Sequence, residues 1–213
     1  MSNIYKSAMK VKLCGFTDEK SVEVAIACKC DFIGFVFCKD SVRYISPEDA
    51  AKISAKIPSG IAKVAVVVDA GFDFLSKISQ KFSPDFFQFH GQEDVSFLQM
   101  VRQKFPQIKI IKAFRISNDS DLDQVKYFEE VVDFFLFDSK KAGSGESFDW
   151  KILRDFHGKK DWFLSGGLNI NNIDEALQIT GAKMIDISSG IEKVRGLKSP
   201  ELIERLMKKL RHC

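Results

Sequence analysis

The regular alternation of strand-like and helix-like segments is the feature that most restricts how this chain can fold. Eight segments have the length and the apolar, often aromatic or β-branched character of buried strands. They are residues 10–14, 31–37, 62–69, 85–89, 108–114, 131–138, 161–165 and 182–188. Between them, apolar residues recur at helical spacing, which predicts eight helices. The fifth is expected around Leu122, Val125 and Phe128, the sixth at 150–156, and the last around 202–210.

Strands that alternate with helices pair in parallel through right-handed crossovers. Eight such units without a break in composition favour one closed (β/α)₈ barrel, the TIM-barrel form of the α/β class, as a single domain over residues 1–213. An open doubly wound sheet is the alternative. It would normally carry a G-x-G-x-x-G loop after its first strand, and Cys14-Gly15-Phe16-Thr17 does not match that pattern.

The charge pattern indicates a small-molecule partner. The chain has 32 basic and 29 acidic residues spread along its length, so no basic arm or acidic tail suggests nucleic acid or a membrane surface. No apolar run resembles a signal peptide or a membrane span, which predicts a cytoplasmic protein. Five cysteines form an odd set, as expected for free thiols. Cys28-Lys29-Cys30 lacks the usual zinc spacing, so no metal site is predicted.

Function in a (β/α)₈ barrel gathers at the carboxyl ends of the strands, so the residues at those ends are the candidates for chemistry. The polar, reactive or glycine residues there are Cys14, Arg43, Gln88, His90, Asp138, Gly166, Gly167, Asp186, Ser188, Ser189 and Gly190. Two glycine-rich turns on the adjacent seventh and eighth strands are typical of a phosphate site. Their alternative role is only to shape the turns.

Cys14 and Asp138 are the candidate acid–base pair, expected on opposite sides of the barrel mouth. A thiol is a usable base where neighbours stabilise its thiolate, and a carboxyl group partly desolvated near Phe135 and Phe137 can stay protonated as an acid. Asp138 precedes a Gly- and Ser-rich loop at 140–147 that we expect to cover a bound substrate. The alternatives are a buried core thiol at Cys14 and a turn-capping carboxylate at Asp138.

Arg43 and His90 have two possible roles each. The guanidinium of Arg43 can bind a carboxylate or phosphate through two hydrogen bonds, or it can be a solvated loop cation. His90 can donate a hydrogen bond to a ligand, or it can only close a turn.

Six segments together resemble the phosphoribosylanthranilate isomerase family of tryptophan biosynthesis. They are VKLCGFT at 11–17, GFVFCKDSVRYISPEDA at 34–50, FQFHGQE at 87–93, LFDSKKAGSGESFDW at 136–150, LSGGLNINNIDEA at 164–176 and IDISSGIEKVRGLKSPELI at 185–203. They occur in the family's order and cover nearly the whole chain. The resemblance implies a barrel that converts N-(5-phosphoribosyl)anthranilate from an aminoaldose into an aminoketose, an Amadori rearrangement that needs no cofactor.

The resemblance also implies roles for individual residues. Cys14 matches the base that removes the proton from C2′ of the sugar, and Asp138 matches the acid that protonates the ring oxygen. Arg43 matches the residue that holds the anthranilate carboxylate. The phosphate-loop positions match Gly166, Gly167, Ser188, Ser189 and Gly190, and the other polar pocket positions match Gln88, His90 and Asp186.

The sequence departs from the family pattern at Asp18, Cys38, Val42, Ala142, Ser144 and Arg195. None of these removes a proposed catalytic group, but Ala142 and Ser144 change the loop expected to cover the substrate, and with it the turnover rate. The rival functions are a histidine-pathway aminoaldose isomerase, a metal-dependent sugar-phosphate epimerase and a non-catalytic phosphate-binding barrel. The first would need a pair of acids and a second phosphate loop. Both a monomer and a homodimer are compatible with the sequence.

Overall fold

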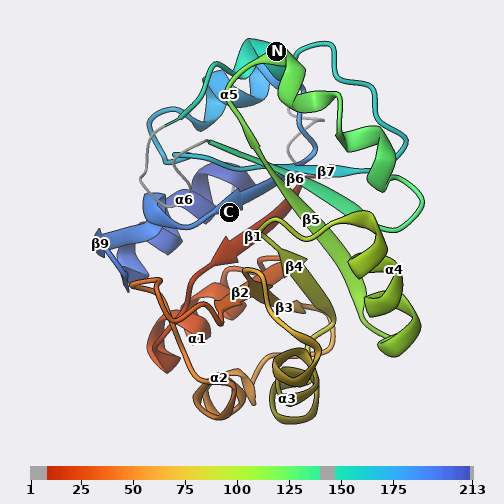
Figure 1. Cartoon of the computed structure of the whole chain (residues 1–213). Coiled ribbons are helices and arrows are strands. Elements are labelled where there is room, and N and C mark those ends of the chain that lie inside the picture. Colours follow the sequence, from red (N-terminus) through yellow and green to blue (C-terminus); the bar gives the residue numbers. More distant parts are fainter. Residues whose placement is uncertain (1–8, 140–146, 212–213) are drawn as a thin grey trace.

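A computed structural model describes residues 9–139 and 147–211 of the chain. Within these ranges eight parallel strands close into a barrel, in sequence order around the ring (Figure 1). The strands are β1 (Lys10–Cys14), β2 (Phe32–Val36), β3 (Ala62–Val67), β4 (Phe86–Phe89), β5 (Lys109–Ile116), β6 (Phe134–Ser139), β7 (Trp162–Leu164) and β8 (Met184–Ile187). Because β1 pairs with both β2 and β8, the predicted barrel is confirmed and the open sheet is excluded.

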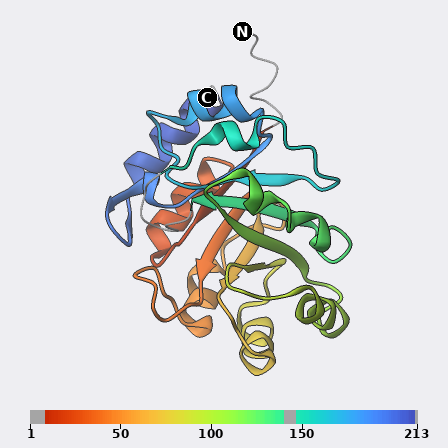
Figure 2. The ribbon, with the colours of Figure 1, turned by 45° about the horizontal axis from the view of Figure 1, so that its top comes forward.

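Helices surround the barrel on its outside (Figures 1 and 2). They are α1 (Glu19–Ala27), α2 (Pro47–Ser54), α3 (Phe72–Phe82), α4 (Val95–Lys104), α5 (Ile173–Thr180) and α6 (Pro200–Arg211). In α6 the apolar residues at helical spacing, among them Ile203, Leu206 and Leu210, are buried as the sequence predicts. None of the helices in the described ranges combines the length and apolar character needed to cross a membrane.

The prediction of an α-helix was wrong for the fifth and sixth positions. The fifth position is occupied by two short 3-10 helices, η1 (Asp119–Leu122) and η2 (Val125–Phe128). The sixth position is occupied by one short 3-10 helix, η3 (Trp150–Leu153). At the fifth position, the Asp121 carboxylate accepts hydrogen bonds from the Ser117 and Asn118 backbone amides at 2.7 and 3.1 Å. Such side-chain bonds compete with an α-helix. The sixth segment ends after about one turn, too short to offset the cost of helix nucleation.

A ring of four phenylalanines closes the amino-terminal end of the barrel interior. Phe32, Phe86, Phe134 and Phe163 contact one another in a closed circle, with neighbouring ring centroids 5.2 to 5.8 Å apart. Three of them are the first residues of β2, β4 and β6. Edge-to-face packing of this kind fills the space without polar atoms. The polar groups inside the barrel are therefore placed toward its opposite, carboxyl-terminal end.

The sequence reasoning missed a small antiparallel hairpin after β8. It consists of β9 (Glu192–Val194) and β10 (Leu197–Lys198). The turn passes through Gly196, whose φ of +90° favours glycine. A Cβ atom there would lie 2.9 Å from the Val42 carbonyl oxygen, so the turn packs tightly against the loop that follows β2. Figure 1 shows β9 projecting at this edge of the barrel.

Candidate active site

A cavity of about 430 Å³ opens at the carboxyl ends of the strands. It is lined by the predicted site residues Cys14, Arg43, Gln88, His90, Asp138, Gly166, Gly167, Asp186, Ser188 and Ser189. Gly190 does not line it, but it packs directly behind the wall: a Cβ atom on Gly190 would lie 2.1 Å from the Leu168 carbonyl oxygen. The barrel thus brings together residues that are far apart in the sequence.

Cys14 ends β1 with its side chain on the cavity wall, and only 6% of the residue is exposed. Burial raises the pKa of the thiol; Asp186 acts in the same direction, while Lys12 and Lys198 oppose it. Gly34 leaves the space that the sulfur occupies, since a Cβ atom there would lie 2.7 Å from Sγ. Cys14 is therefore as buried as a core thiol, yet it faces the cavity.

Lys12, which the sequence reasoning missed, lies below Cys14 on the same face of β1. Its side chain is fully buried, and its Nζ donates to Asp186 Oδ1 at 2.8 Å. Burial alone would lower the pKa of Lys12, but Asp186 and Cys14 outweigh it and the pKa is raised. A charged residue two positions from Cys14 on a buried strand was the available signal, because strand residues two apart share a face.

Asp138 lies near the end of β6 and has two polar neighbours. The Ser139 backbone amide donates to Oδ1 at 2.8 Å, and His90 Nε2 lies 3.3 Å from Oδ2. Gln88 Nε2 lies 3.4 Å from the other ring nitrogen of His90. If the Gln88 amide donates to Nδ1, the ring proton is on Nε2, the nitrogen nearer Asp138, but Nε2 has no hydrogen-bond partner among the described residues.

The two glycine-rich turns form the wall beside Asp138. Gly166 has a φ of +88°, and a Cβ atom there would lie 2.8 Å from the Ser139 nitrogen and 3.2 Å from Asp138 Oδ1. The Gly167 carbonyl accepts from the side-chain amides of Asn169 and Asn172 at 3.1 and 2.9 Å. Glycine is therefore needed for close approach to the acid, and the asparagines fix the turn before α5.

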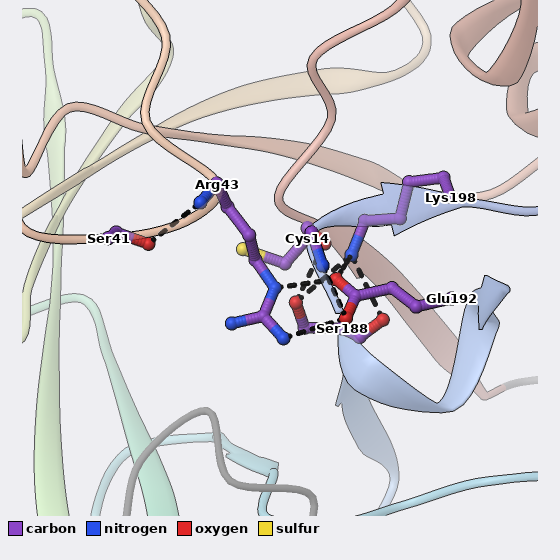
Figure 3. Close-up of polar contacts among 7 residues, drawn as sticks. Cys14, Ser41, Arg43, Ser188, Glu192 and Lys198 are labelled. Atoms are coloured by element: carbon purple, nitrogen blue, oxygen red, sulfur yellow. Dashed lines mark hydrogen bonds and ion pairs between the residues drawn. The ribbon is translucent and has the colours of Figure 1, made fainter. Parts of the chain in front are cut away.

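Arg43 is not a solvated loop cation, because only 6% of it is exposed. Its Nε and Nη2 donate to the two carboxylate oxygens of Glu192 at 2.6 and 2.9 Å. Lys198 Nζ donates to Glu192 Oε1 at 2.7 Å (Figure 3). The sequence reasoning missed Glu192 and Lys198, which belong to the unpredicted hairpin.

The loop expected to cover the substrate, with Ala142 and Ser144, lies outside the described residues except for Ser147. In the part of the chain that the structure describes, no three His, Cys, Asp or Glu side chains are placed to hold a metal ion. The described groups can exchange protons with a bound molecule at two places, a buried thiol and a hydrogen-bonded carboxyl group.

Comparison with known proteins identifies the family. The family model for N-(5′-phosphoribosyl)anthranilate isomerase matches residues 11–209. Proteins of that name from Sinorhizobium fredii and Zymomonas mobilis are 39% and 36% identical to this chain, covering 96% of it and 94% and 99% of their own lengths. A crystal structure of phosphoribosylanthranilate isomerase with reduced 1-(o-carboxyphenylamino)-1-deoxyribulose 5-phosphate superimposes with a TM-score of 0.83 at 30% identity, covering 96% of this chain and all of that one. The chain therefore belongs to the N-(5′-phosphoribosyl)anthranilate isomerase family.

Proposed function

We propose that this chain isomerises N-(5′-phosphoribosyl)anthranilate to 1-(2-carboxyphenylamino)-1-deoxyribulose 5-phosphate, a step of tryptophan biosynthesis, with Cys14 as general base and Asp138 as general acid. The observation that carries the proposal is the shared cavity. A buried thiol and a carboxyl group that lies 3.3 Å from a histidine line the same space, together with Arg43 and two glycine-rich turns. The substrate has a carboxylate at one end and a phosphate at the other, and the cavity offers donors for both.

Asp138 starts the reaction by giving its proton to the ring oxygen of the sugar. The C1′–O bond breaks, the nitrogen lone pair forms the C1′=N bond, and the open Schiff base results. The carboxylate left on Asp138 keeps the Ser139 amide as a donor that stabilises its negative charge, and His90 Nε2 lies 3.3 Å from its other oxygen.

Cys14 then removes the proton from C2′ as a thiolate. The electron pair of the C–H bond forms C1′=C2′, the C=N electrons return to nitrogen, and the resulting enolamine tautomerises to the ketose. Because the pKa of Cys14 is raised, its thiolate is less populated near neutral pH but is a stronger base. The nearby ammonium group of Lys12 favours the thiolate at the moment it forms.

Binding is assigned to the remaining polar residues. Arg43 holds the anthranilate carboxylate, because a guanidinium binds a planar carboxylate through paired hydrogen bonds. Gly166, Gly167, Ser188, Ser189 and Gly190 hold the phosphate, for which backbone amides and hydroxyls are suitable donors. Asp186 and Gln88 face the sugar, and Gln88 Oε1 has no hydrogen-bond partner within the described ranges.

The proposal is tested with purified protein by following the loss of substrate fluorescence. We expect Asp138→Asn to lower kcat by about 10²- to 10⁴-fold with little change in KM, as for the loss of a general acid. Cys14→Ala should lose activity to a similar degree. Cys38→Ala is the matched control, since Cys38 also lines the cavity but is given no chemical role.

Three results would count against the proposal. Decay at the rate seen in buffer would favour a non-catalytic phosphate-binding barrel. Full activity in Cys14→Ala would remove the proposed base. A purely raised KM in Asp138→Asn would mean that Asp138 binds the substrate without protonating it.

A further inference from the structure

We propose that Glu192 and Lys198 are positioning residues that aim Arg43 at the substrate carboxylate. The inference rests on the proposed function, in which Arg43 binds that carboxylate. Neither residue lines the cavity, whereas Arg43 does. Both are held on the hairpin of β9 and β10, where Glu192 contacts Arg43 directly and Lys198 contacts Glu192 and Ser188.

The contacts around Glu192 fix one edge of the guanidinium. Oε1 accepts from Arg43 Nε and Lys198 Nζ, and Oε2 accepts from Arg43 Nη2 and the Gly196 amide at 3.1 Å. Each carboxylate oxygen thus has two donors. Arg43 has five N–H groups, and these contacts use one on Nε and one on Nη2. The Nη1 edge is left for a second carboxylate, and Figure 3 shows it on the side away from Glu192.

The charges explain why a lysine accompanies the pair. Burial would raise the pKa of Glu192, but the bonds from Arg43 and Lys198 outweigh it and lower the pKa to about 2. Arg43 and Glu192 alone would form a neutral pair with little attraction for an anion. Lys198 donates to Glu192 Oε1, the Ser188 carbonyl and Ser188 Oγ, which matches the three donors of an ammonium group. Burial lowers the pKa of Lys198, and Glu192 opposes that effect. With Lys198 protonated, the cluster carries one net positive charge.

The same cluster connects the regions that surround the substrate. Ser188, bound by Lys198, donates its hydroxyl to the Cys14 carbonyl oxygen at 3.0 Å. Gly15 makes the convergence possible: a Cβ atom there would lie 2.6 Å from Arg43 Cδ and 3.2 Å from both Lys198 Nζ and Ser188 Oγ. Gly15 therefore lies where three parts of the site meet: Arg43, the turn at Ser188 and Cys14.

Binding of two ligands shows whether Glu192 positions Arg43 or only supports the structure of the whole site. One is the reduced product analogue, 1-(o-carboxyphenylamino)-1-deoxyribulose 5-phosphate in reduced form, and the other is the same molecule with hydrogen in place of the carboxylate. We expect Glu192→Gln to weaken binding of the first about tenfold, the scale of one hydrogen bond to a charged group. Binding of the second should change less than about twofold.

The sign of the effect is informative because Glu192→Gln removes a negative charge from beside Arg43. If charge alone mattered, the carboxylated analogue would bind more tightly to the variant; tighter or unchanged binding therefore overturns the proposal. Equal weakening of both ligands also overturns it, since that indicates general distortion. Glu129→Gln is the matched control: it removes a glutamate paired with Lys159 at 3.4 Å, and we expect both affinities to stay unchanged.

Arg43→Gln distinguishes failure of this inference from failure of the proposed function. If this variant weakens binding of both ligands equally, Arg43 does not bind the carboxylate and the assignment under the proposed function is wrong. If Arg43→Gln is selective for the carboxylated analogue while Glu192→Gln is not, only the positioning role is refuted. Thermal unfolding of each variant shows whether the loss of binding follows from loss of fold.

Discussion

Replacing Lys12 by methionine is the most direct test of how the barrel interior is held together. Lys12 and Asp186 form an ion pair of 2.8 Å with side-chain exposures of 0% and 6%. Methionine fills most of the space of the lysine stem but removes the charge. Asp186 would then be a buried carboxylate that has lost its ion-pair partner, and Cys14 would lose a neighbour that favours its thiolate.

The expected cost follows from the burial of the pair. Removing one partner of a buried ion pair typically destabilises a protein by about 3–5 kcal/mol, because the remaining charge is left uncompensated. For a chain of this size, that corresponds to a fall in Tm of roughly 6–20 °C. Adding Asp186→Asn to Lys12→Met removes the orphaned charge, and we expect it to return the stability to within about 2 kcal/mol of wild type.

Thermal unfolding followed by circular dichroism measures the effect, and Lys10→Met is the control. Lys10 lies two residues away on the same strand and pairs with Asp31 at 2.9 Å, but its side chain is 57% exposed. Such surface pairs contribute about 0–1 kcal/mol. Asp31 also keeps Arg211 and the Val11 amide as partners.

Equal, small losses of Tm in Lys12→Met and Lys10→Met would refute the reasoning. They would mean that the interior of the barrel screens the Asp186 charge as well as surface water does. Failure of the double variant to recover stability would show that the lysine acts through packing of its stem.

Three further predictions concern the site. Because burial raises the pKa of Cys14, the rate of its alkylation by iodoacetamide, followed by mass spectrometry, should still be rising at a pH where an ordinary thiol has ionised; a profile from about pH 6 to about pH 10 that levels off below pH 8 would contradict this. Glu192 has its pKa lowered from 4.5 to about 2, so its stabilising contribution is complete above pH 4.5 and is lost as the pH falls toward 2. Acid unfolding of Glu192→Gln should therefore depend less on pH in that window than wild type; identical slopes would show that Glu192 is not held by the ion pairs. Gly15→Ala should cost about 1–3 kcal/mol of stability, since φ is +85° there, and should raise KM by displacing Arg43; wild-type values in thermal unfolding and in kinetics would contradict both.

The barrel was predictable because its evidence is local. Each buried strand shows as an apolar run, each helix as a spaced pattern, and their alternation leaves few topologies. Where local side chains override the pattern, as the Asp121 carboxylate does for the Ser117 and Asn118 amides, the prediction was wrong. The missed hairpin of β9 and β10 is short, and only Gly196 marks its turn in the sequence.

The sequence alone predicted a large part of the cavity lining: ten of the eleven candidates line it, because the strand ends of a closed parallel barrel share one rim. It did not determine which polar groups pair inside. Lys12 meets Asp186 across 174 positions, and Arg43 meets Glu192 across 149. The alternation of side chains along a strand shows which of them face inward. The partner of each depends on how β1 pairs with β8 and on where the hairpin of β9 and β10 packs. That choice, and with it the electrostatics around Cys14 and Arg43, was made by the tertiary structure.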